Sequence, residues 1–105
     1  MKTYNVIIEP EAKKQMRQHL SYIKNRLKNP QAAKNVYRDF LASVGKLSTT
    51  AGSIKEPEDE ALIKRGLKRR NFDRHEYFVL FRVVGDEAQV TNVFHFRENF
   101  IAKLK

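Results

Sequence analysis

Apolar residues recur every three or four positions between Pro10 and Leu47, and one break at Asn29–Pro30 divides them into two stripes. The first stripe contains Ala12, Met16, Leu20, Ile23 and Leu27, and the second contains Ala33, Val36, Tyr37, Phe40, Leu41, Val44 and Leu47. Residues at this spacing share one face of a helix, so the pattern predicts two amphipathic helices. Their short connection makes them antiparallel neighbours, and their apolar faces then need a further layer to cover them.

The rest of the chain has the patterns of β-structure. TYNVII (3–8) is β-branched and apolar, and it ends before Pro10, a residue suited to the first position of a helix. STTAGSIKEPEDE (48–60) is a loop, and after it we predict strands in LIKRGLKRR (62–70), EYFVLFRVV (76–84) and AQVTNVFHF (88–96). GDE (85–87) is the turn of a hairpin between the last two strands, and the tail ENFIAKLK adds a short helix.

These elements predict one α+β domain over residues 1–105, in the order β-α-α-β-β-β. A small, twisted, mainly antiparallel sheet of about four strands packs on the N-terminal two-helix hairpin. Strict alternation along the last strand separates two groups of side chains: Val90, Phe94 and Phe96 on one side, and Thr91, Val93 and His95 on the other. We expect the phenylalanine side to face the helices and the His95 side to be open.

The formal net charge is +9, which favours a nucleic acid or an acidic protein as a partner. Residues 61–74 hold six basic residues against one acid, whereas KEPEDE (55–60) holds four acids against one lysine. The candidate contacts for nucleic acid or a partner protein in this segment are Lys64, Arg65, Lys68, Arg70 and Arg74. The alternative is a solvated strand edge, where cationic side chains discourage aggregation.

Cysteine is absent, which excludes disulfides, thiolate metal sites and cysteine nucleophiles. The three histidines are scattered, and we expect no metal and no cofactor. Lysines and arginines interrupt every apolar run, so we predict neither a signal peptide nor a membrane span, and a cytoplasmic location.

Four segments in their order resemble the RelE/ParE superfamily of type II toxin–antitoxin toxins. They are the opening strand, the helical hairpin with YIKNRLKNPQAA (22–33), the hairpin YFVLFRVVGDEAQV (77–90) and the ending VFHFREN (93–99). The resemblance implies a small basic bacterial toxin that a cognate antitoxin neutralises. It also implies one of two targets, because RelE-like members cut mRNA in the ribosome and ParE-like members act on DNA gyrase.

The RelE-like site uses a basic pair before the central hairpin, an arginine on the hairpin, an arginine at the end of the last strand and a tyrosine in the tail. Aligned on Tyr77, the basic pair corresponds to Arg69 and Asn71, and the hairpin arginine corresponds to Phe78. The last-strand arginine corresponds to Arg97, and the tail tyrosine corresponds to Phe100. Only Arg69 and Arg97 match, so the resemblance is slightly closer to ParE-like members. Other ribosome-dependent members use a histidine near this end, which would correspond to His95.

Two hypotheses for the target follow. In the first, the protein binds gyrase without chemistry, and His95 and Arg97 are interface or structural residues. In the second, it is a metal-free endoribonuclease in which His95 is the acid or base and Arg97 and Arg69 hold phosphate. An exposed Phe78 or Phe96 would then stack a base. A simpler reading makes His95 a solvated surface residue and pairs Arg97 with Glu98.

Both hypotheses imply the same set of partners. They are a cognate antitoxin, whose acidic or amphipathic segment folds onto this basic surface, and either gyrase or the ribosome with its mRNA. We expect no membrane partner, and an oligomer only through the antitoxin complex. A third possibility is a basic nucleic-acid-binding module that shares only the architecture. We also expect His75, in a charged turn, to be solvated, and His19 to be structural or exposed.

Overall fold

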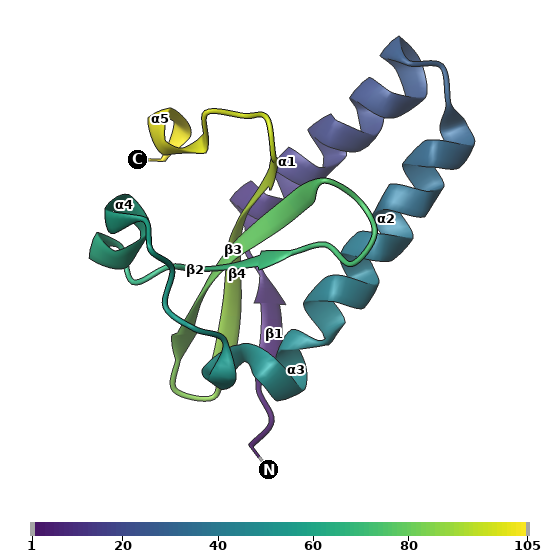
Figure 1. The fold of residues 1–105 in the computed structure, drawn as a ribbon. Helices are drawn as coiled ribbons and strands as arrows, with labels where there is room; N and C mark the ends of the chain where they lie inside the picture. Colours follow the sequence, from purple (N-terminus) through teal and green to yellow (C-terminus); the bar gives the residue numbers. More distant parts are fainter. Residues whose placement is uncertain (1, 105) are drawn as a thin grey trace.

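The computed structural model describes residues 2–104 and has the α+β architecture that the sequence predicts (Figure 1). Its strands are β1 (Asn5–Ile8), β2 (Lys68–Asn71), β3 (Tyr77–Val84) and β4 (Glu87–His95). They form one sheet in the order β1-β4-β3-β2, in which β1 runs parallel to β4 and the other pairs are antiparallel. The predicted hairpin turn is present, with Gly85 at φ 58°.

The helical hairpin consists of α1 (Pro10–Ser21), extended by a π-helical turn at Tyr22–Arg26, and α2 (Pro30–Gly45). Each helix begins with a proline, and the Asn29 side chain caps α2 by accepting a hydrogen bond from the Ala32 N–H at 3.0 Å. Shorter helices follow at α3 (Leu47–Thr50), α4 (Glu60–Lys64) and α5 (Phe100–Lys103), with a 3-10 turn at Ala51–Ser53. Within residues 2–104, no helix is long and apolar enough to cross a bilayer.

The strand predicted at 62–70 is only partly correct. Asp59 caps a helical turn by accepting from the Ala61 N–H at 2.8 Å, and Leu62 to Lys64 are therefore helical. Gly66, at φ 67°, ends this turn, so that β2 begins only at Lys68.

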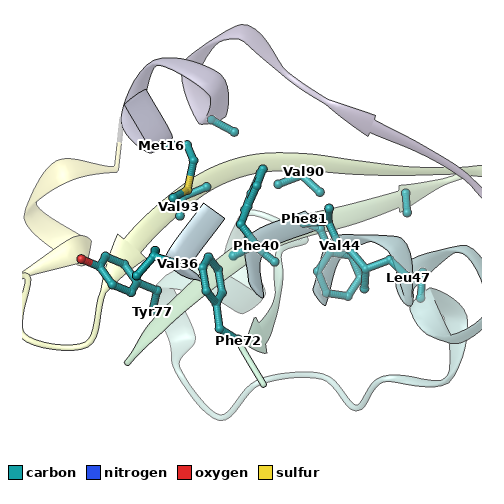
Figure 2. Close-up of a cluster of buried hydrophobic side chains, with 14 of the residues drawn as sticks. Met16, Val36, Phe40, Val44, Leu47, Phe72, Tyr77, Phe81, Val90 and Val93 are labelled. Atoms are coloured by element: carbon teal, nitrogen blue, oxygen red, sulfur yellow. The ribbon is translucent and has the colours of Figure 1, made fainter. Parts of the chain in front are cut away.

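The main core lies between the sheet and the helical hairpin (Figure 2). Met16, Val36, Phe40 and Val44 from the helices pack there against β3 and β4 residues such as Phe81. Two residues of the predicted α2 stripe, Tyr37 and Leu41, are instead 44% and 45% exposed. Asp39 and Ser43 take inward positions on α2 in their place.

A second core covers the opposite face of the sheet, where α4 and α5 lie (Figure 1). It contains Leu62, Leu67, Phe78, Leu80 and Phe94, with Phe100 and Leu104 packed against them. The sheet is therefore covered by apolar side chains on both faces, and the expectation of one open face is wrong.

The expected orientation of the last strand is also wrong. Val93 lies in the core under the helices, and Phe94 lies in the second core. The pairing of β3 and β4 shifts between Leu80 and Phe81, which pair with Asn92 and Val90, so that Thr91 forms a bulge. A bulge interrupts strict alternation, and Val90 consequently faces the helices together with Val93.

Candidate functional site

His95 ends β4 on the helix-facing side of the sheet. It pairs with Tyr77, and the two rings meet edge to face at 4.8 Å between centroids. The His95 backbone N–H donates to the Glu98 carboxylate at 2.8 Å, and the ring Nδ1 accepts from the Arg97 N–H at 3.1 Å. The imidazole is thus half-buried and held by its neighbours.

Arg97 does not continue the strand. β4 ends at His95, and Arg97 is an exposed residue of the turn that leads toward α5. The alternation that would place the two side chains on one strand face therefore does not apply to Arg97. The group of Arg97 that contacts the His95 ring is its backbone N–H.

Glu98 organises this end of the sheet. Its carboxylate accepts from the His95 N–H, lies 2.5 Å from Lys103 Nζ and lies 3.4 Å from His19 Nε2. Burial raises the pKa of the Glu98 carboxyl, but these hydrogen bonds and charges outweigh burial and hold the pKa below its ordinary value. His19 also contacts the Val93 carbonyl oxygen at 3.0 Å, so the expected structural role for His19 is confirmed.

Arg69 lies on the other face of the sheet. It pairs with Leu80 of the second core, and its guanidinium lies 3.7 Å from the centroid of the Phe78 ring and 5.2 Å from that of Phe96. Its Nε donates to the Asn71 side chain at 2.9 Å. Burial lowers the pKa of the Arg69 guanidinium, which nevertheless stays charged at neutral pH.

A pocket of about 450 Å³ opens beside Arg69. Asn71 and Phe100 line it together with Glu58 and Asp59, which belong to the acidic loop KEPEDE (55–60). The acidic loop therefore shares a surface with the arginine, and it reduces the net positive charge there.

The structure separates the residues of the nuclease hypothesis. His95 and Tyr77 face the helices, whereas Arg69 and Phe78 face α4 and α5. The four-stranded sheet lies between the imidazole and the guanidinium. Phe78 is fully buried, so its ring is not accessible for stacking on a base, whereas Phe96 is 41% exposed.

The remaining basic candidates divide into two groups. Lys68 Nζ donates to the Ile54 carbonyl oxygen at 2.8 Å, and Arg70 pairs with Asp73 at 3.2 Å, so both serve internal contacts. Lys64, Arg65 and Arg74 are exposed, although Arg65 also donates to the Ala61 carbonyl oxygen at 2.8 Å. These three residues are the exposed members of the predicted set.

Asp39, Ser43 and His75 form a polar cluster that the sequence reasoning missed. The Asp39 carboxylate is 4% exposed and lies 2.7 Å from His75 Nδ1, and it also accepts from the backbone N–H groups of Asp73 and Arg74. The expectation that His75 is solvated is therefore only partly correct, because its side chain is 31% exposed but Nδ1 is engaged by Asp39. The available signal was an acid and a serine four residues apart on the apolar face of α2. Among residues 2–104, no three histidine, aspartate or glutamate side chains gather as a metal-ligand set, here or at another place.

No protein-family model matches the sequence, and no curated protein matches it. The structure is similar to a solved chain described as "Chromosomal ParDE TA system from P. aeruginosa", with a TM-score of 0.75 and 18% sequence identity. The similarity covers 89% of this chain and 96% of that chain. The α+β fold implied by the RelE/ParE resemblance is thereby confirmed: this chain has the fold of a chain of that ParDE system.

Proposed function

We propose that the protein is the toxin of a bacterial type II toxin–antitoxin system. The observation that carries this proposal is the shared fold, which spans 96% of a chain from a ParDE TA system and leaves almost no part of that chain unmatched. The net charge of +9 and the segments that resemble RelE/ParE toxins agree with it.

The proposed target is DNA gyrase, reached by protein binding and not by chemistry. The geometry favours binding, because RNA cleavage by His95, Arg97 and Arg69 would require groups on two faces of the sheet to meet at one phosphate. The His95 ring is also engaged by Tyr77 and by the Arg97 N–H. The ribosome-dependent mRNA endonuclease is the alternative, and the two hypotheses differ in whether toxicity depends on the imidazole.

The proposed regulator is a cognate antitoxin with an acidic or amphipathic segment. The exposed cations Lys64, Arg65 and Arg74 are candidate contacts for it, because opposite charge accelerates the encounter. In this proposal the toxin acts in the cytoplasm and forms oligomers only through the antitoxin complex.

Expression from an inducible promoter tests the proposal. We expect the wild-type protein to stop bacterial growth, and co-expression of the antitoxin from the adjacent reading frame to restore it. We also expect His95→Ala to remain toxic, because the ring has a packing role that contributes about 1 kcal/mol to stability and no chemical role.

A thermal melt of purified His95→Ala serves as the control for folding, and a primer-extension assay on translating ribosomes reports mRNA cleavage. Loss of toxicity in a folded His95→Ala protein, together with cleaved mRNA from the wild type, would establish the nuclease instead. Normal growth on expression of folded wild-type protein would contradict the toxin proposal itself.

A further inference from the structure

A concavity of about 730 Å³ lies where α2 meets the turn between β2 and β3. Asn35 and Arg38 of α2 line it together with Lys46, the residue after α2, and Asp73, Arg74 and His75 line it from the turn. It is distinct from the region around His95 and from the pocket beside Arg69, which have other lining residues.

The acids at this concavity are already engaged by internal partners. The Asp39 carboxylate lies 2.7 Å from His75 Nδ1 and accepts from Ser43 and two backbone N–H groups, and Asp73 pairs with Lys46 at 2.6 Å and with Arg70 at 3.2 Å. The pKa of the Asp73 carboxyl lies below its ordinary value, chiefly because Lys46 donates a hydrogen bond to it. Both carboxylates are therefore engaged within the protein.

The cations that remain are Arg38 and Arg74. Within residues 2–104, neither guanidinium forms an ion pair, and both residues are exposed. His75 also lines the concavity: its Nδ1 is engaged by Asp39, and its side chain is 31% exposed. Three lining cations, Arg38, Lys46 and Arg74, outnumber the two lining acids, Asp39 and Asp73, so the concavity has a positive balance.

The turn that carries two of these groups is fixed in place. The Asp39 carboxylate accepts from the Asp73 N–H at 3.1 Å and from the Arg74 N–H at 2.9 Å, and Ser43 Oγ accepts from the Asp73 N–H at 3.2 Å. A site whose backbone is held before the ligand arrives loses less entropy on binding.

We propose that this concavity binds a phosphate group, either free or in a polynucleotide strand, through Arg38, Arg74 and His75. Guanidinium groups bind phosphate as planar forks, and a tetrahedral anion offers oxygens to donors that approach from several directions. The volume of about 730 Å³ exceeds that of a single phosphate, so there is room for the attached sugar or for a neighbouring unit of a strand. The inference does not depend on the toxin function.

The test is a titration of the ¹⁵N-labelled full chain, followed by NMR, with inorganic phosphate and with a short single-stranded RNA. We expect saturable shifts at Arg74 and His75, and affinity lower by about tenfold or more in an Arg38→Gln/Arg74→Gln variant. Arg17→Gln/Arg26→Gln is the matched control, because it removes the same charge from exposed arginines of α1 and the π-helical turn, and it should bind as the wild type does.

A second arm uses sulfate, whose charge is constant near neutral pH. Because sulfate and phosphate share a tetrahedral arrangement of oxygens, sulfate should compete with inorganic phosphate for the concavity. The Arg38→Gln/Arg74→Gln variant should bind sulfate about tenfold more weakly than the wild type does.

Stronger binding by RNA than by inorganic phosphate identifies a strand as the source of the phosphate, and equal binding identifies a free phosphate. The inference is overturned if neither probe gives saturable shifts at the turn, if the control variant weakens binding as much as Arg38→Gln/Arg74→Gln, or if an acidic peptide competes more strongly than either probe.

Discussion

Asp39→Ala should lower the free energy of unfolding by about 3 kcal/mol. The substitution removes the acceptor of the Ser43 hydroxyl, of two backbone N–H groups in the β2–β3 turn and of the His75 ring. These donors lie partly or fully inside the protein, where water replaces the lost bonds poorly. Urea denaturation followed by circular dichroism at neutral pH measures the change. Ser43→Ala removes one donor to the carboxylate and an acceptor of the Asp73 N–H, which Asp39 still accepts, and it should cost only about 1 kcal/mol.

The pH dependence of a further variant, Asp39→Asn, tests whether the carboxylate charge is the cause. Burial raises the pKa of the Asp39 carboxyl, but the hydrogen bonds that it accepts outweigh burial and hold the pKa below its ordinary value of 3.8. A lowered pKa means that the stabilisation is complete above the pKa of the unfolded chain and is lost as the pH falls through the folded-state pKa. The difference in stability between wild type and Asp39→Asn should therefore shrink in acid, and a constant difference would contradict the charge-based explanation.

Phe78→Ala should lower the free energy of unfolding by about 4 kcal/mol. The ring is completely buried, and it lies 5.2 Å from the Phe100 ring and 5.9 Å from the Phe94 ring, between centroids, while the Arg69 guanidinium covers its face. The substitution opens a cavity in the second core, which also anchors α5. The measurements are urea denaturation and limited proteolysis, and the tail should be cleaved faster in the variant.

Phe96→Ala is the matched control for this second core. Its ring lies 6.1 Å from the Phe78 ring, between centroids, but Phe96 is 41% exposed. The substitution should therefore lower the free energy of unfolding by only about 1 kcal/mol. An equal decrease in the free energy of unfolding for the two variants would mean that burial of Phe78 is not the main contribution to the stability of the second core.

Local patterns predicted β1, the two long helices and the β3–β4 hairpin, but they missed the short helices α3 and α4. Pro10 and the Asn29–Pro30 break mark the starts of α1 and α2, and Gly85 marks the β3–β4 turn. Side-chain alternation gave the wrong orientation for β4, because the bulge at Thr91 arises from the pairing with β3 and the sequence of β4 alone does not show it. The second core was missed because the segments that cover this face, around α4 and α5, each contribute only a few apolar residues and show no period.

The candidate site was harder to predict because it depends on contacts between distant positions. His75 and Asp39 are 36 residues apart in the sequence, and only the packing of α2 against the turn brings them together. Arg69 was expected near His95, but the register of β2 on β3 places it on the face of Leu80. The sheet face on which each side chain lies therefore determines which candidate residues are close together.

Supercoiling of relaxed plasmid DNA by purified gyrase, titrated with the purified wild-type protein, tests the proposed mode of action most directly. The account predicts inhibition that saturates with protein concentration, that His95→Ala reproduces, and that the antitoxin abolishes. Uninhibited gyrase at concentrations that cut mRNA on translating ribosomes would contradict it.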